Sequence, residues 1–383
     1  MMSLFSEEFF QGALLGLFVV ATLCQMAFIL TAWRWFPAAQ TAKPKQYWGT
    51  HEGVSVVICA RNEARNLRLF LPEILAQQYA GDWEVLVVDD DSSDETYSVL
   101  LEYQALAPRL HVLRVTEKHH PGKKQALSEG IKAARFDCIL LTDADCVPTS
   151  AHWLQHMVQP LADHSGTEIV LGYGPMQDTS QGGFLENWAR FETAFVATQY
   201  TTFALAGLPY MGVGRNLAFR KAIFDRVDGF STHTHIASGD DDLLVNATAT
   251  RFNTACCLHP DAFVFSSGKK TWRSWLQQKR RHLMAGVAYK PLHQMLLGML
   301  ALSHTLHFFL LFVLLGFHIG TKTALFLWLS RSILLLFLFR KSFSTLREPG
   351  LLSLFPIYDA LLAVYYGAFV PITLIGKKTH SWK

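Results

Sequence analysis

Long apolar runs lie at both ends of the chain, and a polar, charged stretch lies between them. The segment Gln11–Trp33 contains no charged residue and is long enough to cross the hydrocarbon core of a bilayer as a helix. The acidic residues Glu7 and Glu8 precede it, and the run is longer than the apolar core of a signal peptide. Residues 1–36 are therefore predicted to form a retained transmembrane anchor rather than a cleaved signal peptide.

Further apolar blocks predict about three more membrane segments in the region 292–376. The basic segment Arg340–Arg347 separates the second block from the third. The third block contains Pro356, Asp359 and Pro371, which are uncommon in a helix that faces lipid. Four spans in total are expected, and the alternative is that the third block is re-entrant or interfacial. The blocks are Leu292–Gly320, Ala324–Phe339 and Leu351–Ile375.

Basic residues beside the apolar segments predict which side of the membrane the middle of the chain occupies. Arg34, Lys43 and Lys45 follow the first segment, and a second basic cluster covers residues 269–281. Lys and Arg mark the cytoplasmic side of membrane proteins. We therefore expect an integral protein of the plasma or inner membrane, with a cytoplasmic middle domain and an external N-terminus. The stretch 269–291 mixes tryptophans, leucines and basic residues, which predicts an amphipathic helix in the membrane interface.

The C-terminal tail does not fit four spans. Four crossings would place its basic residues outside, against the same rule. The topology of the C-terminal segments therefore stays open at this point. These basic residues are Lys377, Lys378 and Lys383.

The middle of the chain, residues 50–268, alternates short β-rich runs with helical stretches. This order is typical of an α/β domain with a parallel sheet and crossover helices. Helices are expected at Asn66–Gln77, at Ser92–Ala105 and up to Ala134, with Asp94 in the first turn of the second. The strands are expected at Val54–Cys59, Trp83–Val88, Leu110–Val115 and Asp137–Leu141.

Composition narrows the class of function. A net charge of +3 without a dense basic stripe does not indicate a nucleic-acid partner. The six cysteines show neither zinc-site spacing nor C-x-x-C pairs, so reduced, buried thiols are expected.

Acidic clusters follow two of the predicted strands. Asp89–Asp91 ends the second strand, and Asp143 and Asp145 follow the fourth. Ligands of open α/β sheets bind beyond the carboxyl ends of the strands, so these side chains are expected to converge. Asp143 and Asp145 are two positions apart, so both carboxylates can point the same way. Carboxylate oxygens suit Mg²⁺ or Mn²⁺, which substrate phosphates then help to coordinate.

Two further clusters have both a structural and a chemical interpretation. Lys123, in the Gly122–Lys124 turn, is either a basic surface residue or a contact for a diphosphate. Asp241 is the candidate general base that would deprotonate an acceptor hydroxyl, and Asp240 suits a helix N-cap. His233 and His235 could supply a metal ligand, although surface histidines are more common.

Four motifs, in this order and spacing, resemble the donor-binding motifs of the inverting, membrane-integrated glycosyltransferases of family 2. That family contains cellulose, chitin and hyaluronan synthases and ceramide glucosyltransferases. The resemblance covers about residues 50–290 and implies a GT-A-like nucleotide-diphospho-sugar transferase domain. The motifs are Val56–Glu63, Val87–Thr96, Gly122–Leu127 and Leu141–Asp145.

The resemblance implies a role for several single residues. Glu63, Asp90 and Asp143 would contact the nucleoside, Asp145 would bind the metal, and Lys123 would lie near the diphosphate. The segment Gly214–Arg220 resembles the acceptor end of the family's site, which implies substrate contacts for Gly214, Arg215 and Asn216. Gly239–Asp241 resembles the segment that carries the base, with Asp240 beside the substrate and Asp241 as the base.

One motif departs from the family pattern. Gln278 and Arg281 stand where the family has Gln-x-x-Arg-Trp, but His282 replaces the tryptophan. The interpretation that Gln278 and Arg281 are substrate-binding residues competes with a solvated helix face. Because the tryptophan stands beside the acceptor in the family, its replacement by His282 argues against processive polymer synthesis.

Together these features predict a membrane-bound inverting glycosyltransferase. It would transfer a sugar from a nucleotide-diphosphate donor, UDP-linked, to a lipid or glycan acceptor of the cell envelope. The alternatives are a processive polysaccharide synthase and a non-catalytic nucleotide-sugar-binding component of a polymer export assembly.

Overall fold

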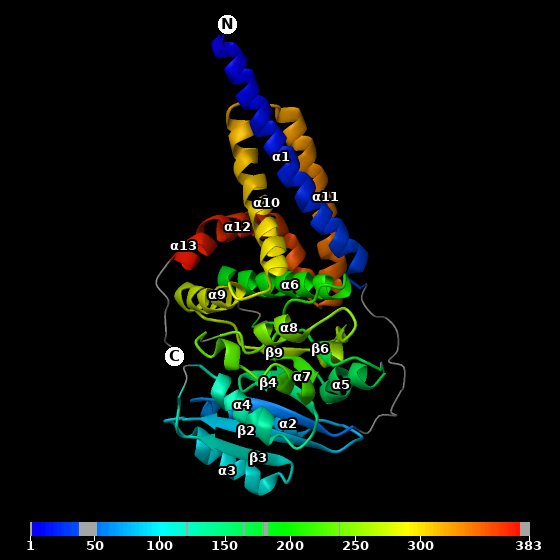
Figure 1. Ribbon diagram of the computed structural model, residues 1–383, viewed down its shortest axis with the longest axis vertical. Coiled ribbons are helices and arrows are strands. Elements are labelled where there is room, and N and C mark those ends of the chain that lie inside the picture. The colour runs from blue at the N-terminus through cyan, green and yellow to red at the C-terminus, as the bar shows by residue number, and fades with distance from the viewer. Residues whose placement is uncertain are drawn as a thin grey trace. The chain divides into compact units, whose positions relative to one another are not determined.

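The computed structural model of the protein describes residues 2–37, 52–119, 122–163, 165–177, 179, 183–236 and 238–375. Two compact units divide these residues: an α/β unit between residues 52 and 289, and a helical unit formed by both chain ends (Figure 1). The basic residues that were used to orient the chain lie partly outside the described residues. Those outside are Lys43, Lys45, Lys377, Lys378 and Lys383.

A seven-stranded mixed sheet forms the centre of the α/β unit, with strand order β3-β2-β1-β4-β7-β6-β8. The first four strands in this order are parallel to one another, and β7 is antiparallel to both β4 and β6. The four predicted strands are confirmed, and β5 and β9 pair separately. The strands are β1 Val54–Ala60, β2 Trp83–Asp90, β3 Leu110–Val115, β4 Cys138–Asp143, β5 Cys146–Pro148, β6 Ile169–Leu171, β7 Leu217–Arg220, β8 Thr254–Cys256 and β9 Val264–Ser266.

Helices cover both faces of the sheet. One set of alternating strand residues, such as Val85 and Val87, packs into a core with the helices α2, α3 and α5. The opposite face of β2 carries Val88, which clusters with Ala126 of α4. At Gly130 of α4 a Cβ would lie 2.7 Å from Val88 Cγ2, so glycine lets this helix approach the sheet closely. The helices are α2 Ala64–Leu75, α3 Thr96–Leu106, α4 Lys124–Ala133, α5 Trp153–Asp163, α7 Lys221–Arg226 and α8 Asp242–Thr248, with the 3₁₀ turns η1 Ser231–His233 and η2 Pro260–Ala262.

The helix predicted at Ser92–Ala105 begins later than expected, at Thr96. Asp94 accounts for the difference, because its Oδ1 accepts a hydrogen bond from the Thr96 amide at 2.9 Å. The Asp94 carboxylate thus precedes the helix and satisfies an amide at its start, rather than lying in the first turn.

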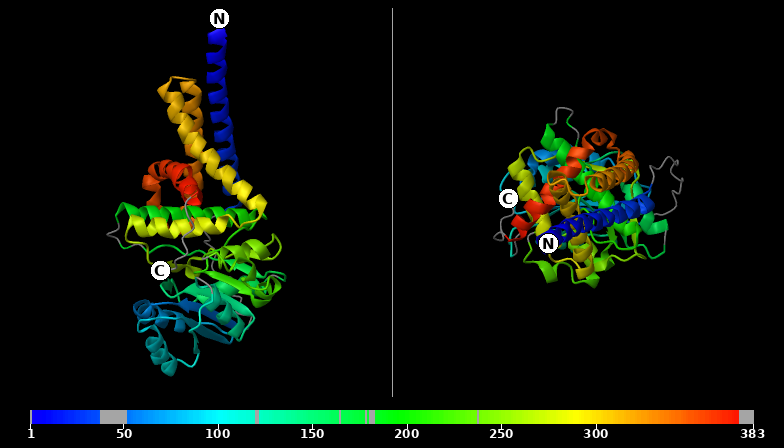
Figure 2. Two further views of the ribbon diagram at one scale, coloured as in Figure 1. Left: turned by 60° about the vertical axis from the view of Figure 1, so that its left-hand side comes forward. Right: turned by 90° about the horizontal axis from the view of Figure 1, so that it is seen from above.

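Two long helices of the α/β unit, α6 (Phe184–Leu205) and α9 (Trp272–Gly286), run side by side (Figure 2). Lys279 forms a buried ion pair with Glu192, and the rings of Trp188 and Trp275 lie 5.9 Å apart. The predicted helix in 269–291 is therefore confirmed as a helix. Its place in a membrane interface stays a prediction.

The helical unit contains four segments that are long and apolar enough to cross a membrane: Glu7–Trp35, Pro291–Gly316, Thr321–Thr345 and Pro349–Ile372. The second and third are shifted from the predicted blocks. The left-handed Gly320 lies in the turn between them, and α11 continues through the basic residues Arg340 and Lys341. Arg340–Arg347 is therefore not a loop, as had been predicted. The helices are α1 Met2–Trp35, α10 Pro291–Gly316, α11 Thr321–Thr345, η3 Pro349–Leu354, α12 Phe355–Val364, the π-helix η4 Tyr365–Phe369 and α13 Val370–Ile375.

Asn216, immediately before β7, joins three parts of the α/β unit. Its side-chain amide donates to the carbonyls of Tyr173 and Ala262, both at 2.8 Å, and its oxygen accepts from Trp153 Nε1 at 2.9 Å. Asn216 and Trp153 are fully buried. Buried polar groups that lose such partners are costly, because no water replaces the bond.

We predict that Asn216→Ala lowers the thermal unfolding midpoint of the purified protein markedly. The substitution leaves two carbonyls and one indole N–H without partners, at a cost of about 1–3 kcal/mol for each buried group. Differential scanning fluorimetry in detergent measures the change. The exposed Asn187→Ala on α6 is the control, and an equal loss in both variants would contradict the role assigned to Asn216.

Candidate active site

The polar clusters predicted at the strand ends do lie at one edge of the sheet. In the parallel register, Cys59 of β1 pairs with Asp143 of β4, and Ala60 pairs with Asp89 of β2. The carboxyl ends of three adjacent strands therefore present Asn62, Asp90 and Asp143 side by side.

Lys123 stands at the centre of this edge. Its ammonium Nζ lies 3.1 Å from Asp143 Oδ1 and 2.9 Å from Asp240 Oδ2. Burial opposes the charge on Lys123, but the nearby Asp143, Asp240 and Asp241 raise its pKa well above the ordinary value. Lys123 is therefore a fixed cation that holds the β4 carboxylate and the acidic loop before α8 together. Its side chain remains 20% exposed and that of Asp143 38% exposed, so both can be reached from solvent.

Asp241 has a fixed orientation because both of its carboxylate oxygens accept backbone hydrogen bonds. The Gly214 amide donates to Oδ2 at 2.5 Å, and the Asp242 amide donates to Oδ1 at 2.9 Å. A Cβ on Gly214 would lie 3.1 Å from the same Oδ2, so a side chain at this position would crowd the carboxylate. Burial raises the pKa of Asp241, and Asp240 raises it further. Such a carboxylate is a stronger base than an exposed aspartate.

Asp143, Asp145 and Cys146 bring possible metal-ligating atoms within 4.8 Å of one another. Burial and the negative charge of Asp143 raise the pKa of Asp145, so the two carboxylates repel each other as they stand. Burial also raises the pKa of the Cys146 thiol well above its usual range, which leaves the sulfur neutral. The residues therefore fit a hard divalent cation held by Asp145 with help from Asp143, not a thiolate-bound metal.

A second cluster, His156, His259 and Asp261, has the composition of a transition-metal site but not the geometry. The two imidazole rings stack 4.0 Å apart with an interplanar angle of 15°. A metal ion lies close to the plane of each imidazole ligand, and one ion cannot do so for two stacked rings. The Asp261 amide also donates to His259 Nδ1 at 3.2 Å. We therefore assign no metal to this cluster.

Asp90 lies at the end of β2 and is completely buried. Its Oδ2 accepts from Lys118 Nζ at 2.8 Å, while Oδ1 has no hydrogen-bond partner among the described residues. Burial raises the pKa of Asp90, and Lys118 partly offsets this effect. The unsatisfied oxygen is a ready acceptor for a ligand donor such as a base N–H or a ribose hydroxyl.

The loops that follow β1 and β2 support each other beside Asp90. The Asn62 amide donates to Ser92 Oγ at 3.0 Å, and the Ser93 amide donates to Asn62 Oδ1 at 2.8 Å. Asn62 and Asp91 both have positive φ, a conformation that is rare outside glycine and that clusters at functional sites. Glu63 follows Asn62, and its Oε2 accepts from Asn66 at 2.5 Å.

The residues predicted at the acceptor end fall into different environments. Arg215 donates to the Gly174 carbonyl at 2.5 Å and lies close enough to Asp145 to lower its pKa. A Cβ on Gly174 would lie 2.1 Å from Arg215 Nε, so only glycine leaves room for this guanidinium. Asn216 has no exposed surface; the predicted direct contact with substrate is therefore wrong for this residue, which supports the site from behind.

The helix α9 contributes its motif to the same region. The Arg281 carbonyl accepts from Ser238 Oγ at 2.7 Å, which ties α9 to the loop that carries Asp240. Burial lowers the pKa of Arg281, and Asp240 opposes this effect. His282 is exposed and Gln278 is partly buried; substrate contacts for both stay predictions.

Three residues that support the site were not predicted from the sequence: Lys118, Lys124 and Tyr289. Lys124 donates to the carbonyls of His233 and Ile236, which fixes the chain before the Asp240 loop. Burial lowers the pKa of His233 to about 4, and its backbone, rather than its ring, makes this contact. A signal existed only for Lys118, because it follows the strand next to β2, on the edge that carries Asp90.

Asp242 is a buried carboxyl next to the candidate base. Tyr289 Oη donates to its Oδ2 at 2.6 Å. Burial raises the pKa of Asp242 to about 8, and Asp241 adds to the effect. In the unfolded chain the same group titrates near its model value of 3.8. Folding therefore takes up a proton between these two values, and this contribution to stability is lost as the pH rises through them.

We predict that Asp242→Asn stabilises the protein more at pH 8 than at pH 5, relative to the wild type. Asparagine can accept the Tyr289 hydrogen bond without taking up a proton. The difference in free energy of unfolding should grow by up to about 1.4 kcal/mol per pH unit. Unfolding midpoints at the two pH values measure it. The exposed Asp225→Asn is the matched control, and a difference independent of pH would contradict the prediction.

Comparison with known proteins agrees with the site. Residues 55–228 match the family model described as Glycosyl transferase family 2. The glycosyltransferase AglE of Haloferax volcanii is 28% identical over 193 residues, which cover 49% of this chain and 58% of that protein. The beta-monoglucosyldiacylglycerol synthase of Trichormus variabilis is 24% identical over 224 residues, 57% of this chain and 47% of that protein. The matches span about half the length of these curated relatives.

The solved structure of the mannosyltransferase PcManGT from Pyrobaculum calidifontis, in complex with GDP-Man and Mn²⁺, has a similar fold. It aligns with a TM-score of 0.59 at 19% identity, and the alignment covers 93% of this chain and 99% of that chain. The order of the motifs, the edge where they meet and the family match agree. The chain therefore carries a glycosyltransferase family 2 domain on a GT-A-like α/β fold.

Proposed function

We propose that the protein is a membrane-anchored inverting glycosyltransferase that transfers one sugar from a nucleotide-diphosphate donor to a lipid or lipid-linked acceptor on the cytoplasmic side. The observation that carries this proposal is the arrangement around Lys123. Its ammonium lies between Asp143, on the strand edge, and Asp240, next to Asp241. The donor residues and the candidate base thus belong to one connected polar network.

The nucleoside is assigned to the edge formed by β1 and β2. The free Oδ1 of Asp90 supplies a buried acceptor, and Glu63 lies at the start of the adjacent helix. Carboxylates of this kind suit the N–H groups of a base and the hydroxyls of a ribose. A uridine nucleotide is the proposed donor. The neighbour from Pyrobaculum carries GDP-Man, so guanosine donors form the second arm of the donor screen.

The diphosphate is assigned to the region between Lys123 and Asp145. A divalent cation on Asp145 would offset the negative charge that develops on the leaving nucleotide diphosphate. Lys123 is charged throughout the physiological pH range, as argued above, and adds a second positive group. Arg215 lies near Asp145 with a buried Nε that has no hydrogen-bond partner among the described residues, and it is available for a further anionic contact.

The transfer step is assigned to Asp241. Its carboxylate would accept the proton of the acceptor hydroxyl while that oxygen forms a bond to the sugar carbon and the diphosphate leaves from the opposite face. This geometry inverts the configuration at that carbon. Gly214 and Asp242 hold the carboxylate in one orientation through their amides, so little reorganisation is needed at the moment of reaction.

The lipid acceptor rests on two supports. The chain carries four segments that are long and apolar enough to span a bilayer, which would keep the enzyme at a lipid surface. The Trichormus relative is by its name a synthase of a glucosylated diacylglycerol. A polysaccharide synthase remains the second candidate, and product analysis separates the two: a single added sugar supports our proposal, and a polymer ladder supports the synthase.

We predict that Asp145→Ala lowers transfer by at least about 100-fold, because the cation and the diphosphate lose their shared ligand. The protein is purified in detergent and assayed with UDP- and GDP-sugars, with Mn²⁺ or Mg²⁺ and after chelation. A preserved unfolding midpoint shows that the variant is folded, and the exposed Asp225→Ala is the control. Undiminished turnover in Asp145→Ala would remove the metal assignment.

We predict that Asp241→Asn lowers kcat by about 10²- to 10⁴-fold, the usual range for loss of a general base, with little change in donor binding. In the wild type, activity should rise with pH along an acidic limb whose midpoint lies above the ordinary aspartate value. The sign follows because the base must be ionised and because burial and Asp240 raise its pKa. A pH–rate profile and donor titration measure both effects. A variant that keeps the acidic limb and the wild-type kcat would exclude Asp241 as the base.

A further inference from the structure

The helical unit contains an ion pair within its apolar segments, and this pair bears on the topology. It rests on the proposed function only in that the helical unit is taken to lie in a bilayer. We infer that the fourth apolar segment, Pro349–Ile372, does not cross the membrane. It is a re-entrant segment in contact with lipid, held at one level by Arg331 and Asp359, and the chain ends on the side that carries the α/β unit.

The three long helices alternate in direction, as crossing helices do. At one end of the bundle Leu15 of α1 packs against Gly320, and at the other end Lys341 of α11 donates to the Trp33 carbonyl at 2.7 Å. The helices α1 and α11 are therefore parallel.

The helix α10 runs against α1. Thr22 Oγ1 lies 2.8 Å from His307 Nδ1, and Gln25, further along α1, donates to Ser303 Oγ at 2.8 Å, earlier along α10. Each of the three helices thus traverses the bundle from one end to the other.

The fourth segment behaves differently. Asp359 contacts His304 of α10, Tyr366 has its ring 5.8 Å from the same His304, and Gly367 lies against Thr305. A crossing helix would advance about 10 Å along its neighbour between residues 359 and 366. Here both ends of this stretch meet one turn of α10, so the segment passes across the bundle at a single level.

The shape of the fourth segment agrees with its contacts. The helix α12 has ten residues, and the π-helix η4 and the six-residue α13 follow it. Figures 1 and 2 show α12 and α13 lying across α10 rather than alongside it. Ile357, Val364 and Ile372 are at least half exposed. Apolar side chains exposed along a short, transverse segment suit contact with lipid.

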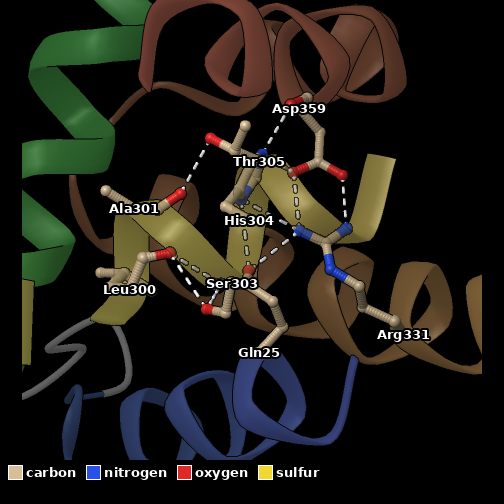
Figure 3. A network of polar contacts seen from close by, with 8 residues as sticks. All are labelled: Gln25, Leu300, Ala301, Ser303, His304, Thr305, Arg331 and Asp359. Carbon is tan, nitrogen blue, oxygen red and sulfur yellow. Dashed lines mark hydrogen bonds and ion pairs between the residues drawn. The ribbon is translucent and has the colours of Figure 1, made fainter. Parts of the chain in front are cut away.

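Figure 3 shows what holds the segment at this level. Arg331 of α11 makes a two-pronged ion pair with Asp359: Nη1 lies 2.5 Å from Oδ2, and Nη2 lies 3.0 Å from Oδ1. Nη2 also donates to Gln25 Oε1 at 3.2 Å. Arg331 and Asp359 are almost completely buried, and a charge inside a bilayer is costly unless it is paired. Asp359 meets this need only when its helix lies beside the middle of α11.

His304 completes the network in one tautomer. Its Nε2 lies 2.9 Å from the Asp359 carbonyl, which can only accept, so the proton is assigned to Nε2. Its Nδ1 then accepts from Arg331 Nη2 at 3.3 Å. The network thereby joins α1, α10, α11 and α12.

Three crossings place the two chain ends on opposite sides. The α/β unit follows α1 and precedes α10, so it shares a side with the tail that follows α13. The basic residues of that tail then lie on the cytoplasmic side, as the distribution of Lys and Arg in membrane proteins requires. The alternative with four crossings places them outside. These residues are Lys377, Lys378 and Lys383.

We predict that a protease-cleavable epitope tag after Lys383 is cut in inside-out vesicles together with the α/β unit, and that a tag before Met1 is cut only from the outside. The full-length protein is used, and carbonate extraction first shows that it is integral. Cleavage of the C-terminal tag from the outside would overturn the inference. Release by carbonate would overturn it as well as the membrane anchoring, while activity in detergent would still report separately on the proposed catalysis.

We also predict that Asp359→Leu lowers the unfolding midpoint in detergent and makes the C-terminal tag accessible from both sides. The double variant Arg331→Leu with Asp359→Leu should recover at least half of the lost midpoint, because no unpaired charge remains. Arg340→Leu, in the exposed last part of α11, is the control. If the double variant falls as far as the sum of the two single changes, the pair does not hold the segment.

Discussion

The charge balance around Lys123 is the constraint on which the candidate site depends. Asp143 on β4 and Asp240 before α8 come from distant parts of the sequence, and one ammonium lies within 3.1 Å of both. Without that cation, these carboxylates and the adjacent Asp241 would repel one another across the strand edge. Lys123 therefore keeps the donor residues and the candidate base in one place before any ligand arrives.

The balance remains incomplete on purely local terms, and this gives the edge its chemistry. Asp145 and Asp241 both have raised pKa values, because burial is not matched by enough positive charge. A divalent cation at Asp145 would offset the first deficit, and an acceptor hydroxyl would supply a proton to the second. Two neighbouring carboxylates can thus have different roles although they share a network.

Much of this arrangement could be predicted from the sequence because it depends on local rules. Strand runs such as Trp83–Val88 are apolar and end in acidic residues, and parallel strands carry their ligands at the carboxyl edge. The register that pairs Cys59 with Asp143 bears this out. Side-chain roles set by packing could not be predicted in the same way. Asn216 belongs to a site motif, yet Trp153 and two carbonyls use its amide entirely.

The helical unit shows the same limit. Hydropathy identifies the four apolar segments, but it does not indicate the level at which a segment lies. Pro356 and Asp359 in the last block were the only hint, and they left a span and a re-entrant segment equally open. The deciding information is the contact of Asp359 with Arg331, which depends on two residues from separate helices.

The two buried ionic networks differ in a way that assigns their roles. In the helical unit Asp359 faces one guanidinium in a two-pronged pair, with one negative charge for one positive charge. Such a pair has no net charge left for a ligand and serves to fix helices. At the strand edge the aspartates outnumber the lysines that contact them, and Asp90 Oδ1 has no hydrogen-bond partner among the described residues. An excess of buried negative charge and unused acceptors is the physical mark of a site that awaits a cation and a donor-rich ligand.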